Sequence, residues 1–270
     1  MNILILGDVA GPSGRNAVVK KLPDLIKKKK IDFVIVNGEN AADTGFGITE
    51  KNAEDFFNAG ADVITSGNHI WDEKETVKFI DKEKRLLRPE NLTKGSPGKG
   101  FGIFVSKNNK KVAVINLMGN VYMKKCEDVF QSAKKFIEDV KLKKDADFIV
   151  VDMHGEITSE KMAMGYLFDG KATMVVGTHT HVPTSDHRIM EKGTAYQTDI
   201  GMCGDYNSVI GMNRDNSLKR FLKDSSAENH FPALGEATIS GLLVVADDET
   251  GLAKKVQPII LGGSLQERIW

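Results

Sequence analysis

ILILGD, residues 3–8, is a short apolar run that ends in glycine and aspartate, and the pattern recurs in DFVIVNGEN (32–40) and DVITSGNH (62–69). Short apolar runs of this kind are typical of buried parallel strands, and longer amphipathic segments are typical of the helices that cover them. The amphipathic segments here are 15–30, 49–60 and 74–85. The sequence therefore begins with a predicted βαβαβα unit whose strands share one sheet through right-handed crossovers.

Hairpins follow this opening unit. Segment 101–120 predicts two strands around an Asn108-Asn109 turn, and similar pairs are predicted at 187–200 and 241–261. Between the hairpins we expect strands at 147–154 and 173–181 and helices at 128–144, 158–170 and 213–222. The sequence contains no internal repeat and no Pro/Gly/Ser-rich linker, so residues 1–270 are predicted to form one domain. Its expected class is α/β, a four-layer α/β/β/α sandwich of two mixed sheets flanked by helices.

The composition excludes several classes of protein. Of 270 residues, 41% are hydrophobic and 27% are charged, and the net charge is +0, which is typical of a globular chain. This balance disfavours dedicated nucleic-acid binding, and the run Lys27–Lys30 is interpreted as a solvated helix end. Two cysteines cannot build a disulfide framework. With no leader-like start and no long apolar stretch, we expect a cytoplasmic protein without membrane contact, and a homo-oligomer is compatible with this reading.

Polar residues follow each predicted buried strand. The carboxyl ends of strands in an open α/β sheet form the crevice where ligands bind, so residues at these ends are expected to converge. A single strand-end histidine is most often structural, but here every such end carries oxygen or imidazole groups. They are Asp8, Glu39, Asn40, Asn68, His69, His154, His179 and His181.

Carboxylate, amide and imidazole groups together favour a transition-metal site. They suit Mn or Fe, with Zn also possible, and the absence of cysteine from the set argues against a structural zinc centre. One Asp, one Glu, two Asn and three His, the set without His69, are seven donors and exceed the needs of one ion, so we expect two divalent ions that share a carboxylate. Two divalent ions carry a charge of +4, and Asp8, Glu39 and a hydroxide offset three of these charges. The site therefore stays positive, which favours a phosphate substrate. P-loop, GxGxxG, GxSxG and HExxH motifs are absent from the sequence.

At these positions the sequence resembles the calcineurin-like metallophosphoesterase superfamily. The shared pattern comprises Gly7-Asp8, Gly38-Glu39-Asn40, Gly67-Asn68-His69, Asp152-Met153-His154 and Gly177-Thr178-His179-Thr180-His181. Within the superfamily it more closely resembles the YmdB-like phosphodiesterases, a likeness that covers nearly the whole length. That likeness is carried by LGDVAG (6–11), NGENAADTGFGIT (37–49), SGNHIWD (66–72), RPEN (88–91), DMHGE (152–156), VVGTHTHVPTSDHRI (175–189), TDIGM (198–202) and SVIGM (208–212).

The resemblance implies two metal sites bridged by Glu39. One ion would take Asp8, Glu39, Asn40 and His181, and the other would take Glu39, Asn68, His154 and His179. Two departures from the wider superfamily matter. Ala10 stands where most members have histidine, so Asn40 must compensate, and Glu39 replaces the usual aspartate. The identity and occupancy of the first metal are therefore left open.

The resemblance also implies a mechanism, in which a metal-bridging hydroxide attacks phosphorus in line. His69 would act as the general acid that protonates the departing alkoxide. The carboxylate that often follows this histidine is absent, since Ile70 stands there. We consider two roles for Asp72: it orients the His69 ring, or it caps a helix, and the helix cap is the favoured interpretation.

Two further segments are candidates for substrate contact. In the loop after Asn40, Gly45 allows close approach and Phe46 can stack on a base, with a simple βα turn as the alternative. Segment 198–203 is a candidate wall of the site, and Cys203 is interpreted as a core residue and not as a nucleophile.

The sequence thus predicts a dinuclear-metal phosphodiesterase that acts on small nucleotide phosphoesters. The resemblance points to 2′,3′-cyclic nucleotides, with 3′,5′-cyclic forms and 2′-phosphomonoesters as further candidates. One alternative is a phosphomonoesterase, nucleotidase or nuclease on the same site. Another is a metal-binding regulatory protein whose catalysis is incidental.

Overall fold

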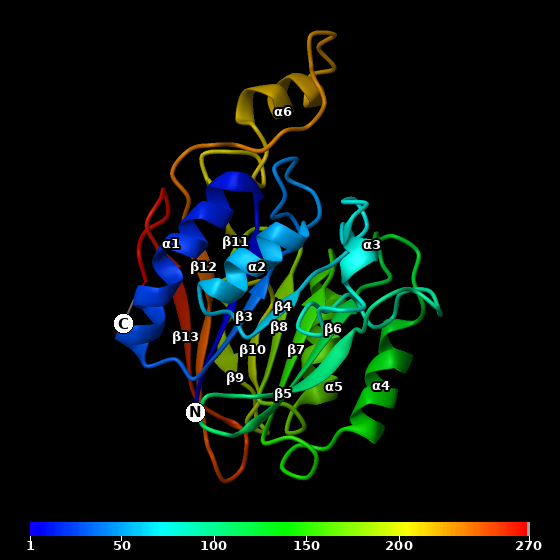
Figure 1. The fold of residues 1–270 in the computed structure, drawn as a ribbon, viewed down its shortest axis with the longest axis vertical. Coiled ribbons are helices and arrows are strands. Elements are labelled where there is room, and N and C mark those ends of the chain that lie inside the picture. Colours follow the sequence, from blue (N-terminus) through cyan, green and yellow to red (C-terminus); the bar gives the residue numbers. More distant parts are fainter. Residues whose placement is uncertain (269–270) are drawn as a thin grey trace.

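Two β-sheets pack face to face in the computed structural model, which describes residues 1–268, and helices cover their outer faces (Figure 1). The first sheet has the order β13 (Ala253–Leu261), β12 (Ile239–Ala246), β1 (Asn2–Leu6), β3 (Phe33–Asn37) and β4 (Val63–Thr65). The second has the order β5 (Phe101–Val105), β6 (Lys111–Met118), β7 (Phe148–His154), β8 (Met174–Thr178), β10 (Ala195–Gln197) and β9 (Arg188–Ile189). Both sheets are mixed, because parallel central strands are flanked by antiparallel ones.

Alternating side chains of the strands build three separate layers of core. Leu4 and Leu6 of β1 face α1 and α2, whereas Ile3 and Ile5 of the same strand pack between the two sheets. On the far side, Ile149 of β7 packs toward α4 and α5. Since both faces of each central strand are covered, the strands read as continuous apolar runs. The predicted four-layer sandwich is confirmed.

The helices begin and end close to the predicted positions in most cases. They are α1 (Gly11–Lys29), α2 (Glu50–Asn58), α3 (Thr76–Phe79), α4 (Val129–Asp139), α5 (Thr158–Phe168) and α6 (Arg214–Phe221). A capping box between Thr49 and Asn52 starts α2, and Asp128 caps α4. Within residues 1–268, none of the helices combines the length and the apolar character needed to cross a bilayer.

The predicted helix over 74–85 is wrong, because only α3 (Thr76–Phe79) is helical there. Phe79 and Ile80 are buried, but Val77 is exposed and the residues after Asp81 are mostly charged. One pair of buried side chains cannot anchor three turns of helix, since most helical stability in proteins comes from an extended apolar face. The chain instead turns back, and Leu86 forms a bridge with Ile64 beside β4.

A small additional sheet, absent from the sequence-based prediction, holds the first strand end in place. β2 (Asp8–Val9) pairs in parallel with β11 (Met202–Cys203). The two chain segments approach closely at Gly7, where a Cβ atom would lie 1.9 Å from the carbonyl oxygen of Gly201. Cys203 is fully buried, and burial raises the pKa of its thiol to about 12, which confirms its interpretation as a core residue.

Candidate metal centre

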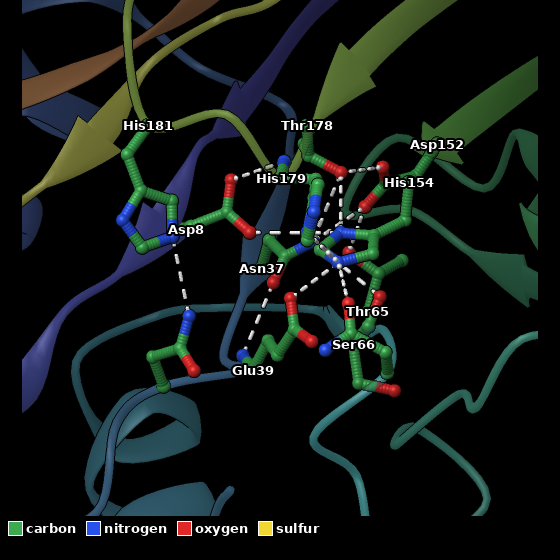
Figure 2. Close-up of polar contacts among 12 residues, drawn as sticks. Asp8, Asn37, Glu39, Thr65, Ser66, Asp152, His154, Thr178, His179 and His181 are labelled. Carbon is green, nitrogen blue, oxygen red and sulfur yellow. Dashed lines mark hydrogen bonds and ion pairs between the residues drawn. The ribbon is translucent and has the colours of Figure 1, made fainter. Parts of the chain in front are cut away.

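The polar residues that follow the central strands come together at one edge of the sandwich (Figure 2). Asp8, Glu39 and Asn68 follow strands of the first sheet, whereas His154 and His179 lie at the ends of β7 and β8 in the second. The edge therefore joins residues from both sheets, as expected for the carboxyl ends of parallel strands.

Three side chains converge on the ring of His154. Its Nε2 atom lies 2.6 Å from Oε2 of Glu39, 3.1 Å from Oδ1 of Asn68 and 3.1 Å from Nδ1 of His179. Gly67 leaves room for this approach, because a Cβ atom there would lie 2.2 Å from the same Nε2 atom. Glu39, His154 and His179 have ligand atoms within 4.8 Å of one another, a spacing compatible with one ion.

The other ring nitrogen of His154 is held by a buried chain of hydrogen bonds. The hydroxyl of Thr178 donates to Asp152 over 2.7 Å, so its oxygen accepts from Nδ1 of His154 over 2.9 Å. Thr65 and Asn37 also donate to the carboxylate of Asp152. This arrangement places a proton on Nδ1 and directs the Nε2 atom toward the cluster, as in many histidine ligands of metals.

Two more histidines are oriented in the same manner. Nε2 of His179 lies 3.3 Å from Glu156, which leaves Nδ1 facing His154. Nδ1 of His181 lies 2.7 Å from the carbonyl oxygen of Ile210, an acceptor only, so its Nε2 atom carries a lone pair. That atom lies 3.2 Å from Nδ2 of Asn40. In the form that would bind a metal ion, each of the three imidazoles would turn one nitrogen lone pair toward the site.

Within residues 1–268, two buried acceptor atoms of the site have no hydrogen-bond partner. These atoms are Oδ1 of Asp8 and Oδ1 of Asn40, whereas Oε2 of Glu39 lies 2.6 Å from Nε2 of His154. Oδ1 of Asp8 lies 3.6 Å from Nδ1 of His154, and the other oxygen of Asp8 accepts from the backbone of His179. Unpaired buried oxygens are costly, and a divalent cation compensates such groups efficiently.

The pKa shifts of the site residues also reflect buried acidic groups without a compensating cation. Burial raises the pKa of Asp8 to about 7, against the attraction of His181 and His154. Burial alone would lower the pKa of His154, but Glu39 and Asp8 raise it to about 9. Burial and the neighbouring His154 lower the pKa of His179 to about 3. Buried negative charge thus attracts a cation to this point, and the donor set fits transition-metal ions.

The turn that carries His179 and His181 is held by a buried ion pair. Both histidines have positive φ angles, 97° and 66°, which are unfavourable for residues other than glycine. Between them, Thr180 donates its backbone N–H and its hydroxyl to Asp199, whose Oδ2 atom also lies 2.8 Å from Nζ of Lys161. Both members of the pair are 1% exposed. The pair thereby stabilises the strained turn and positions the two imidazoles.

Lys161→Met should lower the free energy of unfolding by about 3–5 kcal/mol, because it leaves Asp199 buried without its counter-ion. Urea denaturation of the metal-free protein measures the change, with the exposed Lys135→Met as the control. A loss below about 1 kcal/mol would show that the pair does not stabilise the turn.

His69 lies beside this cluster, and its ring contacts Asp72. Its backbone N–H donates to Oε1 of Glu39 over 2.8 Å, and its Nδ1 atom lies 2.6 Å from Oδ2 of Asp72. Lys124 contacts Asp72 and donates to the carbonyl of Asn68. The helix-cap interpretation of Asp72 is wrong, because the N-cap of α3 is Glu75. Asp72 instead holds the His69 ring, the interpretation that the sequence favoured less.

A cavity of about 280 Å³ opens beside the cluster. Phe46 lines it, with its ring centroid 4.8 Å from that of His69. Gly45 has φ of 80° and packs toward Met212 and Pro232, so the glycine serves a close approach between two loops. His230 also lines this cavity, although it does not follow a strand and was not a candidate from the sequence.

Comparison with known proteins identifies the family of the chain. The sequence profile of YmdB-like proteins matches residues 4–259. The chain belongs to the YmdB-like family. A 2′,3′-cyclic-nucleotide 2′-phosphodiesterase of Bacillus subtilis is 46% identical over 261 residues, which covers 97% of each chain. The family resemblance deduced from the sequence motifs is confirmed.

Two solved structures of similar length share the fold. A novel phosphatase from Mycoplasma pneumoniae is 38% identical with a TM-score of 0.88, over 97% of this chain and 93% of that one. A hypothetical protein from Thermus thermophilus is 37% identical with a TM-score of 0.87, over 97% and 99%. These relatives span nearly the same length as the chain, so the likeness extends over the elements that carry the metal centre.

Proposed function

We propose that the chain is a metal-dependent phosphodiesterase that hydrolyses 2′,3′-cyclic nucleotides. The observation that carries the proposal is the convergence of Glu39, Asn68, His154 and His179 around one point, next to unpaired acceptors on Asp8 and Asn40 within residues 1–268. The activity in the name of the Bacillus subtilis relative supports the choice of substrate.

The residues divide into two groups of ligands. Asp8, Glu39, Asn40 and His181 would hold one ion, and Glu39, Asn68, His154 and His179 would hold the other, with Fe or Mn favoured and Zn possible. When bound, such a pair supplies Lewis acidity and an activated water. Glu39 would serve both groups, because its Oε2 atom faces His154 of one group and its carboxylate is close enough to Asp8 of the other to act on the pKa of that residue.

His69 is in the right position to donate a proton to the leaving group. Its Nδ1 atom is fixed by Asp72, so Nε2 is the nitrogen that remains to face substrate. The ring lines the cavity beside His179 and His181. Asp72 and Lys124 lie next to one another, so the lysine steadies the carboxylate that orients the ring. We assign His69 the role of general acid and Asp72 the role of positioning residue.

Metal analysis of the isolated protein, paired with a panel of substrates, tests the proposal. We expect two transition ions per chain and faster hydrolysis of 2′,3′-cyclic nucleotides than of 3′,5′-cyclic nucleotides, 2′-phosphomonoesters or single-stranded RNA. Removal of the ions with a chelator should abolish turnover, and Mn²⁺ or Fe²⁺ should restore it. Preferred hydrolysis of monoesters or RNA would replace the proposed substrate class, and full activity after chelation would exclude the metal mechanism.

Asp72→Asn should lower kcat about tenfold and leave KM within about twofold, because the ring loses a charged partner but the cavity keeps its shape. The fall should be confined to substrates with an alkoxide leaving group, since 4-nitrophenolate departs without a proton. Glu73→Gln, a neighbouring carboxylate, is the control. An equal loss for both kinds of leaving group would contradict the positioning role.

A further inference from the structure

The cavity beside the metal centre is closed on one side by a segment that projects from the sandwich. This segment, residues 207–232, carries α6, and Figure 1 shows α6 standing beyond the end of the two sheets. The walls of the cavity are Asn40, Phe46, His69, His179, His181, Val209, Ile210, Met212, Ser217, Phe221 and His230. More than half of the wall thus comes from the projecting segment, and the rest comes from the metal centre and its neighbours.

The walls suit a flat aromatic group. Phe46 and Phe221 supply rings, and Val209, Ile210 and Met212 supply apolar surface. Phe221 is 79% exposed, so its ring is accessible to a group in the cavity. Base stacking on aromatic side chains is a common source of affinity for nucleotides.

Among the wall residues outside the proposed metal ligands, the hydroxyl of Ser217 lacks a partner in the described part of the chain. Ser217 is 2% exposed. His230 adds an imidazole, and partial burial together with Arg220 lowers its pKa, which favours the neutral ring. A hydroxyl and a neutral imidazole can each donate or accept, which matches the mixed donors and acceptors on the edge of a base.

The cavity is continuous with the metal centre through one loop. Ile210 lines the cavity, and its carbonyl oxygen holds Nδ1 of His181. The residue has φ of 48°, and the loop is closed by paired backbone hydrogen bonds between Val209 and Met212. A group in the cavity therefore lies next to His181 and Asn40, which are in contact with each other.

We propose that this cavity, formed by residues 207–232 against Phe46, is the subsite for the nucleobase of the substrate. The inference rests on the proposed function, because it assumes that the phosphate lies at the metal centre. The base stacks on Phe221 and Phe46, and the Ser217 hydroxyl bonds to its edge. Its volume of about 280 Å³ is near the lower end of ligand pockets, so it suits one small group and not a folded RNA.

The test compares two substrates that differ only in the base. Adenosine 2′,3′-cyclic phosphate and the base-free methyl riboside 2′,3′-cyclic phosphate are hydrolysed by wild type, Phe221→Ala and Ser217→Ala. We expect wild type to prefer the nucleotide at least about tenfold in kcat/KM, and the two variants to reduce that preference about tenfold and threefold, respectively. Leu218→Ala, on the same helix and exposed outside the cavity, should keep the preference.

A second measurement separates this proposal from the proposed function. Saturation-transfer NMR with adenosine, which has no phosphate, reports occupation of the cavity without hydrolysis. We expect a signal with wild type and Leu218→Ala, and its loss with Phe221→Ala. If neither cyclic phosphate is hydrolysed but adenosine still binds in this pattern, the proposed function fails and the subsite stands. If wild type hydrolyses both phosphates equally well, or Phe221→Ala keeps adenosine, the subsite is wrong.

Discussion

Glu39→Gln should lower turnover about 10⁴-fold or more and remove both ions, since the loss of Lewis-acid stabilisation costs several kcal/mol. The Oε2 atom of Glu39 lies 2.6 Å from His154, and the carboxylate is close enough to Asp8 to add to the effect of burial on the pKa of that residue. An amide keeps the volume of the side chain but loses the charge that attracts the cations.

Metal content and thermal unfolding with and without Mn²⁺ check this prediction. Wild type should be stabilised by Mn²⁺, by about 2.7 kcal/mol at about a hundredfold excess over its dissociation constant, and Glu39→Gln should not respond. Asp43→Asn, at an 83% exposed carboxylate, is the control and should behave as wild type. Retention of two ions by Glu39→Gln would show that the carboxylate does not bridge.

His69→Ala should lower kcat about 10²–10⁴-fold with cyclic nucleotides and keep the metal content of wild type. The ring is fixed by Asp72 and lines the cavity, whereas the hydrogen bond from this residue to Glu39 comes from its backbone N–H. The substitution therefore removes a proton donor without opening the ligand cluster.

The leaving group distinguishes acid catalysis from loss of structure. With a 4-nitrophenyl phosphodiester, whose leaving group needs no proton, His69→Ala should retain at least about a tenth of wild-type turnover. His69→Gln keeps a polar side chain without an acid and should resemble His69→Ala. A similar loss with both substrates, or loss of an ion, would make His69 a structural residue of the centre.

Much of this candidate centre could be predicted because the carboxyl ends of parallel strands lie at the same edge of a sheet. The runs before Asp8, Glu39, Asn68, His154 and His179 are buried strands, so the position of each polar residue follows from where its strand ends. The two-sheet arrangement was inferred from the βαβ units of the opening and the hairpins that follow them. The residue types at the strand ends and the direction of the strands were sufficient to predict which residues converge.

The residues that support the ligands were not recognised, because their partners are distant in sequence. Asp152 lies two residues before His154 and reads as one more strand residue until Thr178 is placed beside it. Lys161 lies on a helix 38 positions from Asp199, and nothing local marks the pair as buried. The short α3 and the role of Asp72 depend equally on tertiary contacts.

The origin of the donors in two different sheets has a thermodynamic consequence. Asp8, Glu39 and Asn68 leave one sheet and His154 and His179 leave the other, with apolar side chains such as Ile5 and Phe148 packed between them. An ion bound by both sets of donors would be sensitive to the alignment of the two sheets. If the ion binds one alignment of the sheets more tightly, that alignment in turn raises the affinity for the ion. Substitutions deep in the middle layer, remote from any reacting atom, can therefore tune the affinity of the centre.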